Sequence, residues 1–212
     1  MNLLSVYKKL LKQFGHQQWW PVRHDFVPPQ LEICIGAILT QNTNWRNVEE
    51  ALQNLSDAKA TSTDAIAKMP LAKLEKLVRP SGFYKQKSKR LKEFGKFVSA
   101  FECNFYKDVT REQLLSIKGI GRETADSILL YACSRSFFVV DAYTRRLFSR
   151  LGIIKGGEDY DELRKMFEKK LPKDVELYKE FHALIVKHEK NSRKEKSSNK
   201  SEKPQNHSQY DY

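Results

Sequence analysis

Apolar residues recur along this chain at the spacing of α-helices, in which positions i, i+3, i+4 and i+7 share one face. The segment LEICIGAIL at 31–39 is apolar at nearly every position, so we expect it to form a helix at the centre of the fold. The other helices that the pattern predicts cover approximately 1–15, 48–55, 71–78, 91–98, 114–117, 125–132, 142–151, 160–170 and 175–187.

Turn and capping signals separate these helices. Pro80-Ser-Gly82 closes one helix, and Thr110 with Gln113 forms a capping box that opens another. The short apolar run FFVV at 137–140 has no partner strand in sight, which favours an extended buried connector over a β-strand. Asp141 then takes the N-cap position of the next helix. Because the sequence has neither alternating strand patterns nor internal repeats, the predicted fold class is all-α.

The composition agrees with a globular protein. Hydrophobic residues make up 40% and charged residues 30% of the 212 residues, which is enough to bury a core. No apolar run approaches the roughly 20 residues that cross a bilayer, and the segment 1–15 lacks the uninterrupted apolar region of a signal peptide. We therefore expect an intracellular protein without membrane contact, cytoplasmic and nucleoid-associated if its source is bacterial. From Asn191 polar residues follow without periodicity, which predicts a disordered tail over 191–212.

A strong positive charge indicates a polyanionic partner. The chain has 38 basic and 26 acidic residues, and its formal net charge is +12. The segment from Lys187 onward holds seven basic and four acidic residues, so most of the charge belongs to the folded body. Nucleic acid is the commonest partner of such a domain, and an ordinary basic surface is the alternative.

The stretch IKGIGRETA places two glycines between two short predicted helices. Glycine permits positive φ and the close approach of another backbone, so Gly119 and Gly121 predict a tight hairpin. The N–H groups at the start of the following helix form an anion site, to which Lys118 and Arg122 add charge. Ile120 is expected to point inward and lock the hairpin. A purely structural turn is the alternative, but the basic body and the motif that follows favour phosphate binding.

The segment LLSIKGIGRETADSILLYACSRSFFVVDAYTRR resembles the helix-hairpin-helix and aspartate region of the endonuclease III superfamily of DNA glycosylases. ILTQNTNWRNV and PSGFYKQKSKRL resemble two further segments of that family, and the resemblance covers roughly residues 19–190. It implies two α-helical lobes with a DNA-binding cleft between them. We therefore expect a first lobe over 24–134, with the helix-hairpin-helix at about 111–131, and a second lobe formed by 1–23 and 135–190.

Asp141 matches the catalytic aspartate of this family. A carboxylate in this place stabilises the oxocarbenium-like sugar that forms when a glycosidic bond breaks, once the base has left the DNA stack. An aspartate that only caps its helix is the alternative. Family members that also cut the strand have a lysine two residues after the second hairpin glycine, where this chain has Glu123. A carboxylate cannot form a Schiff base, so the resemblance implies a monofunctional glycosylase without lyase activity.

The resemblance does not extend to the iron–sulfur cluster of the family. Such clusters are bound by cysteine thiolates, and the residues that follow FHALIVKH include no cysteine. Cys34, Cys103 and Cys133 are far apart in the chain, which argues against a disulfide framework and against a metal site. We therefore expect neither a metal nor a cofactor.

All three tryptophans lie in two segments that approach the extruded base in this superfamily, Trp19-Trp20-Pro21 and Trp45. With Glu123, these residues form the expected base pocket. The combination most resembles the 3-methyladenine DNA glycosylases of endonuclease III type. Aromatic walls suit an electron-poor alkylated purine, because stacking and cation–π attraction contribute roughly 1–3 kcal/mol. Core filling by the tryptophans is the alternative.

Three more residues match family positions near the DNA. Gln41 matches the residue that fills the gap left by the base, and Phe83 matches the wedge beside it. A core position for Phe83 is the alternative. Arg146 matches a family arginine, to which we assign a structural or phosphate-contacting role.

Together these observations predict a monomeric base excision repair enzyme that acts on damaged double-stranded DNA and hydrolyses the glycosidic bond of an alkylated purine. Two alternatives stay open. One is another specificity on the same scaffold, such as a mismatched or oxidised base, and the other is a helix-hairpin-helix protein that binds DNA without catalysis.

Overall fold

The structure, a computed structural model, describes residues 2–201 of the chain and the side chains of residues 2–193. Within this range every regular element is a helix, so the predicted all-α class is confirmed. In chain order the elements are α1 Leu3–Phe14, α2 Gln30–Leu39, α3 Trp45–Asp57, α4 Thr63–Lys68, α5 Leu71–Leu77, the 3₁₀ turn η1 Arg79–Ser81, α6 Tyr84–Ser99, α7 Phe105–Asp108, α8 Arg111–Ser116, α9 Arg122–Ser127, the π-helical turn η2 Ile128–Ala132, α10 Ala142–Arg150, α11 Tyr160–Lys170 and α12 Val175–Ser201.

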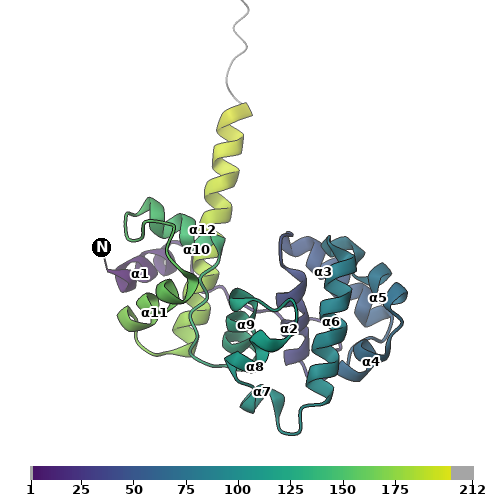
Figure 1. Ribbon diagram of the computed structural model, residues 1–212. Helices are drawn as coiled ribbons and strands as arrows, with labels where there is room; N and C mark the ends of the chain where they lie inside the picture. Colours follow the sequence, from purple (N-terminus) through teal and green to yellow (C-terminus); the bar gives the residue numbers. More distant parts are fainter. Residues whose placement is uncertain (1, 202–212) are drawn as a thin grey trace, which may run out of the picture.

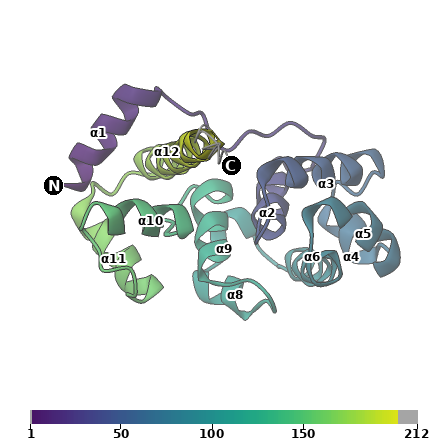
Figure 2. The same cartoon turned by 90° about the horizontal axis from the view of Figure 1, so that it is seen from above.

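The helices form two lobes, with α8 and α9 between them (Figures 1 and 2). The first lobe contains α2 to α6, and the second contains α1 and α10 to α12. The turn η2 contacts both α2 and α12, so it connects the two lobes. The divisions that we expected near residues 23 and 134 fall in the non-helical segments that lead from α1 to α2 and from η2 to α10.

The helix α2 is buried along its whole length from Leu31 to Leu39, which confirms its predicted central place. It packs against α3, α6 and η2. Its buried Glu32 accepts the backbone N–H of Arg23 at 3.1 Å and of His24 at 2.9 Å, and lies 2.8 Å from Nδ1 of His24. These contacts satisfy a charge that would otherwise be costly to bury, and they anchor the segment that follows Trp19 and Trp20.

Aromatic side chains fill the core of the second lobe. Phe138 stacks on Phe167 at 4.6 Å, and Phe148 meets Phe167 edge-on at 4.8 Å. Residues 138–140 are therefore an extended buried connector, as predicted, and not a strand. This burial fixes where the connector ends, which sets the position of Asp141 at the start of α10.

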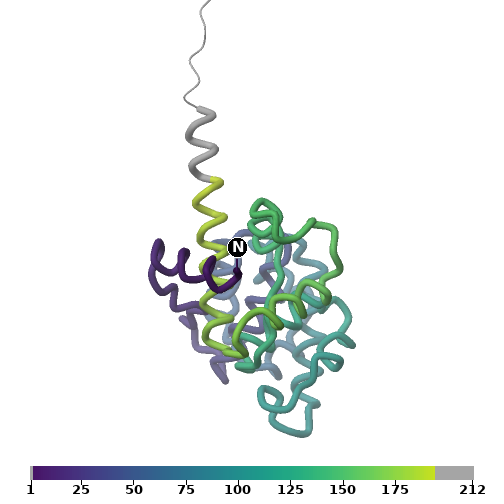
Figure 3. Tube along the Cα trace, turned by 90° about the vertical axis from the view of Figure 1, so that its left-hand side faces the viewer, coloured from purple at the N-terminus to yellow at the C-terminus, as the bar shows by residue number. Residues whose placement is uncertain are grey.

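The last helix is longer than the sequence predicts. We expected a helix that ends near Lys187 and disorder from Asn191, whereas α12 continues to Ser201. The prediction of disorder is therefore wrong for 191–201, and 202–212 lie outside the described residues. Extending a helix that packing has already nucleated adds one backbone hydrogen bond per residue, and Lys, Arg and Glu are good helix formers. The packed part of α12 contacts α10 and lies beside α1 (Figure 3).

Candidate active site and DNA-binding surface

Asp141 ends the buried connector and caps α10. Its Oδ1 accepts the backbone N–H of Thr144 at 2.7 Å. Its Oδ2 lies 3.5 Å from Nε2 of His182 on α12, and 13% of the Asp141 side chain is exposed. Asp141 is thus a helix cap, and the cap occupies only one of its two oxygens.

The environment of Asp141 favours its ionised form. Burial raises the pKa of this carboxyl group, but the contacts with His182 and Thr144 outweigh burial, and the net pKa lies below the usual value for aspartate. An anion held in this way is suited to stabilise positive charge that develops on a ligand.

Glu123, in the first turn of α9, has the opposite environment. Desolvation and the nearby charge of Asp141 raise its pKa from 4.5 to about 7, against lowering effects of His182 and Arg145. The residue as a whole is exposed, so part of this desolvation is relieved by water. Two neighbouring carboxyl groups whose pKa values are pushed apart are typical of catalytic sites.

An aromatic cluster, formed by Trp19, Trp20, Trp45, Tyr131 and His182, lies beside Asp141. Trp19 stacks on Trp20, with 5.5 Å between ring centroids, and on His182, also at 5.5 Å. Trp20 meets Trp45 edge-on at 5.1 Å. The structure therefore brings the three predicted tryptophans together. Pro21 follows them in the chain and is half-buried.

The aromatic cluster packs against a glycine of α2 and borders a hollow at the surface. A Cβ on Gly36 of α2 would lie 3.0 Å from the ring of Trp20, so glycine is what lets Trp20 approach the helix. A hollow of about 150 Å³ opens beside Trp19 and Trp45. Its other lining residues are Gln17, Ala183, Val186, Lys187 and Lys190.

Two residues of the cluster, Tyr131 and His182, are not singled out by any local sequence pattern. The hydroxyl of Tyr131 lies 2.7 Å from Nδ1 of His182, and the Tyr131 ring is edge-on to Trp20 at 5.3 Å. Tyr131 lies within the hairpin and aspartate segment and His182 lies far from it, so their contact between η2 and α12 exists only in the folded chain. The one available signal was a histidine within the apolar run FHALIV of the last predicted helix.

The helices α8 and α9 form the predicted hairpin. Gly119 has φ +92°, which favours glycine, and a Cβ there would lie 2.5 Å from Nε of Arg90. Both the backbone conformation and the close approach of Arg90 therefore require glycine at this position. Ile120 is buried, as expected, whereas Lys118 and Gly121 are exposed. The turn thus presents backbone and one lysine to the surface.

The family model of HhH-GPD superfamily base excision DNA repair proteins matches residues 35–173 of this chain. The chain belongs to this superfamily.

Individual relatives agree with this assignment. A protein of Methanocaldococcus jannaschii, whose name as a DNA repair glycosylase is itself provisional, is 50% identical over 194 residues, 88% of this chain and 86% of the relative. Endonuclease III of Thermotoga maritima is 28% identical over 171 residues, 81% of this chain and 76% of the relative. This chain is also similar to the crystal structure of the H. pylori 3-methyladenine DNA glycosylase bound to 1,N6-ethenoadenine. The two chains match with a TM-score of 0.77 and 36% sequence identity, over 92% of this chain and 99% of that chain.

In this HhH-GPD protein Arg122 is exposed, and its charge is paired with two acidic residues. Its guanidinium pairs with Asp159 at 2.7 Å and with Asp161 at 3.1 Å, which ties the hairpin to the start of α11. Gln41 is likewise held by the hairpin, because its Nε2 donates to Oγ1 of Thr124 at 2.8 Å and its Oε1 accepts from Arg90.

Phe83 is exposed at the start of α6. It is 62% exposed and has φ +46°, a left-handed conformation that is uncommon for an aromatic residue. The alternative of a core position is therefore excluded. A bulky apolar ring held out into solvent has the shape of the predicted wedge.

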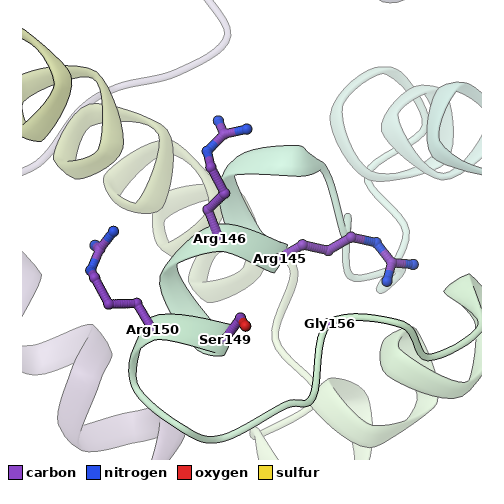
Figure 4. Close-up of a pocket in the computed structure, with 5 residues that line it drawn as sticks. All are labelled: Arg145, Arg146, Ser149, Arg150 and Gly156. Atoms are coloured by element: carbon purple, nitrogen blue, oxygen red, sulfur yellow. The ribbon is translucent and has the colours of Figure 1, made fainter.

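Arginines line a second, open hollow along α10. Its volume is about 430 Å³, and its lining residues are Arg145, Arg146, Ser149, Arg150 and Gly156. Arg145 points to the opposite side of α10 from Arg146 and Arg150 (Figure 4), so the three form an open cationic surface and not a closed pocket for one ligand. The guanidinium of Arg146 lies over the ring of Tyr143 at 4.6 Å.

The residues of this chain do not fit an iron–sulfur cluster. Cys34 is buried and Cys103 is exposed, and both are free thiols. Among the described residues, no group of three or more His, Cys, Asp or Glu side chains could hold a metal ion. On the packed part of α12, the buried carboxylate of Glu189 instead pairs with Arg150 and lies 3.7 Å from Nε of Arg146. No helix in the described range is long and apolar enough to span a membrane.

Proposed function

We propose that this protein is a monofunctional DNA glycosylase that extrudes an N-alkylated purine such as 3-methyladenine from double-stranded DNA and hydrolyses its N-glycosidic bond. The observation that carries the proposal is the pair of carboxyl groups at the site. Asp141 is buried and favours the anion, and Glu123 stands where strand-cleaving relatives have the attacking lysine. The 36% identity to a structure named as a 3-methyladenine DNA glycosylase supports the choice of substrate.

The chemistry requires little of the protein beyond charge and position. When the C1′–N bond breaks, its electron pair leaves with the base, and a base that is cationic before cleavage leaves as a neutral molecule without needing a proton. Positive charge remains on the sugar, where the Asp141 carboxylate stabilises it until water adds. Glu123 has no nucleophilic nitrogen, so it cannot form the imine on which β-elimination of the strand depends.

The aromatic cluster supports recognition of the base. Trp20, Trp45 and Trp19 lie within one cluster next to the histidine that contacts Asp141. Indole rings attract cationic heterocycles more strongly than neutral ones. A site of this kind favours alkylated purines over unmodified adenine, whose glycosidic bond is also stronger.

The test is an excision assay over duplexes with alkylated, oxidised or mismatched bases. We expect release of 3-methyladenine as a free base, with strand nicks only after hot alkali and no protein–DNA adduct after borohydride. Asp141→Asn should reduce release by several orders of magnitude and leave duplex affinity near that of wild type, since the change keeps the shape of the side chain. A trapped adduct contradicts the monofunctional mechanism, and Asp141→Asn that keeps more than a tenth of the wild-type rate contradicts the role of Asp141.

A further inference from the structure

Asp141 is contacted by a histidine that has no partner of its own on that side. His182 is 5% exposed, and its buried Nε2 makes no hydrogen bond of ordinary length within the described chain. The polar group that faces Nε2 is Oδ2 of Asp141, at 3.5 Å. A buried polar nitrogen in this situation calls for an explanation.

The opposite edge of His182 is firmly held. Nδ1 lies 2.7 Å from the hydroxyl of Tyr131, and that hydroxyl is also 3.2 Å from the carbonyl oxygen of Lys179. Burial, followed by the charges of Asp141 and Glu180, raises the pKa of Tyr131 well above its usual value, so Tyr131 keeps its proton. Trp19 stacks on the imidazole, with an angle of 23° between the planes.

These contacts determine where the imidazole carries a proton. The hydroxyl of Tyr131 has one proton, which goes either to the carbonyl of Lys179 or to Nδ1 of His182. In the first case Nδ1 donates to the hydroxyl oxygen, and a ring that also has a proton on Nε2 is then the imidazolium cation; in the second case Nδ1 accepts and the ring is neutral. In both cases Nε2 must carry a proton, because a lone pair facing the Asp141 carboxylate would be repelled.

We propose that His182 is the positioning residue of Asp141, and that it orients the carboxylate and keeps it ionised by donating Nε2–H to Oδ2. Thr144 holds Oδ1 from the other side, so the two contacts together prevent rotation of the carboxylate. Tyr131 and Trp19 in turn hold His182. This inference rests on the proposed function of Asp141. A length of 3.5 Å is compatible with it, because hydrogen bonds at catalytic sites are often long in the free enzyme and tighten in the complex.

Other charged groups face the same site and are taken into account in the test. They are Glu123 from α9, Arg145 from α10 and, behind Tyr131, Glu180 from α12. Glu123 has a pKa of about 7 and is protonated in the acidic range. The acid limb of the pH profile therefore reports Asp141.

The experiment measures kcat and KM from pH 4 to pH 8. The substrate is a duplex that contains the base released by wild type, and the variants are His182→Leu, His182→Gln and Tyr131→Phe. His182→Leu should lower kcat about 10- to 100-fold, the value of a hydrogen bond to a charged group. It should also move the acid limb upward by about one pH unit, with KM within about twofold of wild type. His182→Gln, whose amide can donate from the place of Nε2, should restore most of kcat, and Tyr131→Phe should give a smaller shift in the same direction. The control Lys73→Gln replaces an exposed side chain on α5, in the first lobe, and should change neither value.

A second measurement does not depend on activity. Imidazole ¹⁵N NMR of the wild-type protein should show a protonated Nε2 on His182, which sharpens or shifts on Asp141→Asn. A lone pair on Nε2, or a lowered kcat with an unmoved acid limb, would overturn the proposal. If wild type releases no base from any duplex, the proposed function fails, and the NMR result still decides the contact between His182 and Asp141. If His182→Leu does not fold, His182→Gln, Tyr131→Phe and the NMR result decide.

Discussion

At the scale of single residues, Asp141 and Glu123 show that the local environment sets the pKa of a carboxyl group. Asp141 is the more buried side chain, yet it favours the anion because Thr144 donates to one oxygen and His182 lies 3.5 Å from the other. Glu123 is more exposed as a residue, but desolvation of its carboxyl group and then the charge of Asp141 raise its pKa to about 7. Neither difference follows from residue type, since both side chains end in the same group.

The raised pKa of Glu123 makes stability depend on pH. The native state binds this proton more tightly than the unfolded chain, so the free energy of unfolding falls as pH rises from 4.5 to about 7 and levels off above. We expect Glu123→Gln, which removes the titration, to gain about 1 kcal/mol over wild type at pH 8 and almost nothing at pH 5, after allowance for solvent screening. Urea unfolding at the two pH values measures this. Glu112→Gln, at an exposed position on α8, is the matched control. An equal effect of Glu123→Gln at both pH values would contradict the pKa assignment.

At the scale of elements, α12 holds the second lobe together. It contacts α1, α10 and η2, and it contributes both His182 and the buried Glu189. The side chain of Glu189 is 3% exposed and faces two arginines of α10 that remain 36% and 45% exposed. This ion pair fixes the last helix against the helix that begins at Asp141.

We therefore expect Glu189→Ala to reduce the free energy of unfolding by about 2 kcal/mol, less than for a fully buried pair because Arg146 and Arg150 can still reach water. For a protein of this size the melting temperature should fall by roughly 4–8 °C. The control is Glu176→Ala on the same helix. Glu176 pairs with Lys179, but its side chain is 80% exposed, so the change should reduce the free energy of unfolding by less than about 0.5 kcal/mol. Equal losses in the two variants would show that the contact with α10 adds nothing.

At the scale of the whole molecule, the fold decides where the basic residues behind the net charge of +12 are placed. Lys118 stands on the hairpin, the arginines of α10 form a second cationic surface, and Phe83 projects from the first lobe. Several surrounding cations are neutralised within the protein, as Arg122 is by Asp159 and Asp161. Such pairs leave the net charge unchanged, since it already counts the acidic residues, but they decide which cations stay unpaired at the surface.

Duplex binding should weaken steeply with salt, because each phosphate contact releases condensed counterions. Lys118→Gln should weaken binding to damaged and undamaged duplexes equally and reduce the slope of log K against log salt by about one. Fluorescence anisotropy over a salt series measures both quantities. Lys73→Gln lies on α5, at the end of the first lobe far from α8 and α9 (Figure 2), and should leave the slope unchanged. A loss confined to damaged DNA would place Lys118 in the base pocket instead.

Local sequence patterns predicted the elements that depend on neighbours in the chain. The buried helix α2, the capping box before α8, the extended connector and the cap at Asp141 all follow from short-range spacing. The resemblance of the hairpin and aspartate region predicted the superfamily. The predicted end of α12 was too early, because the polar composition after Asn191 does not show that the packed part of the helix nucleates its continuation to Ser201.

The sequence by itself determined an all-helical HhH-GPD protein with a glycine hairpin and an aspartate at a helix start, since these depend on periodicity, glycine conformation and capping within a few residues. The tertiary structure alone decided which groups meet. His182 and Tyr131 lie 51 positions apart and contact each other at 2.7 Å, and Arg122 reaches acidic residues 37 and 39 positions away. For His182 and Tyr131 the packing of distant helices also removes water, and this burial strengthens their hydrogen bond and shifts the pKa of Tyr131.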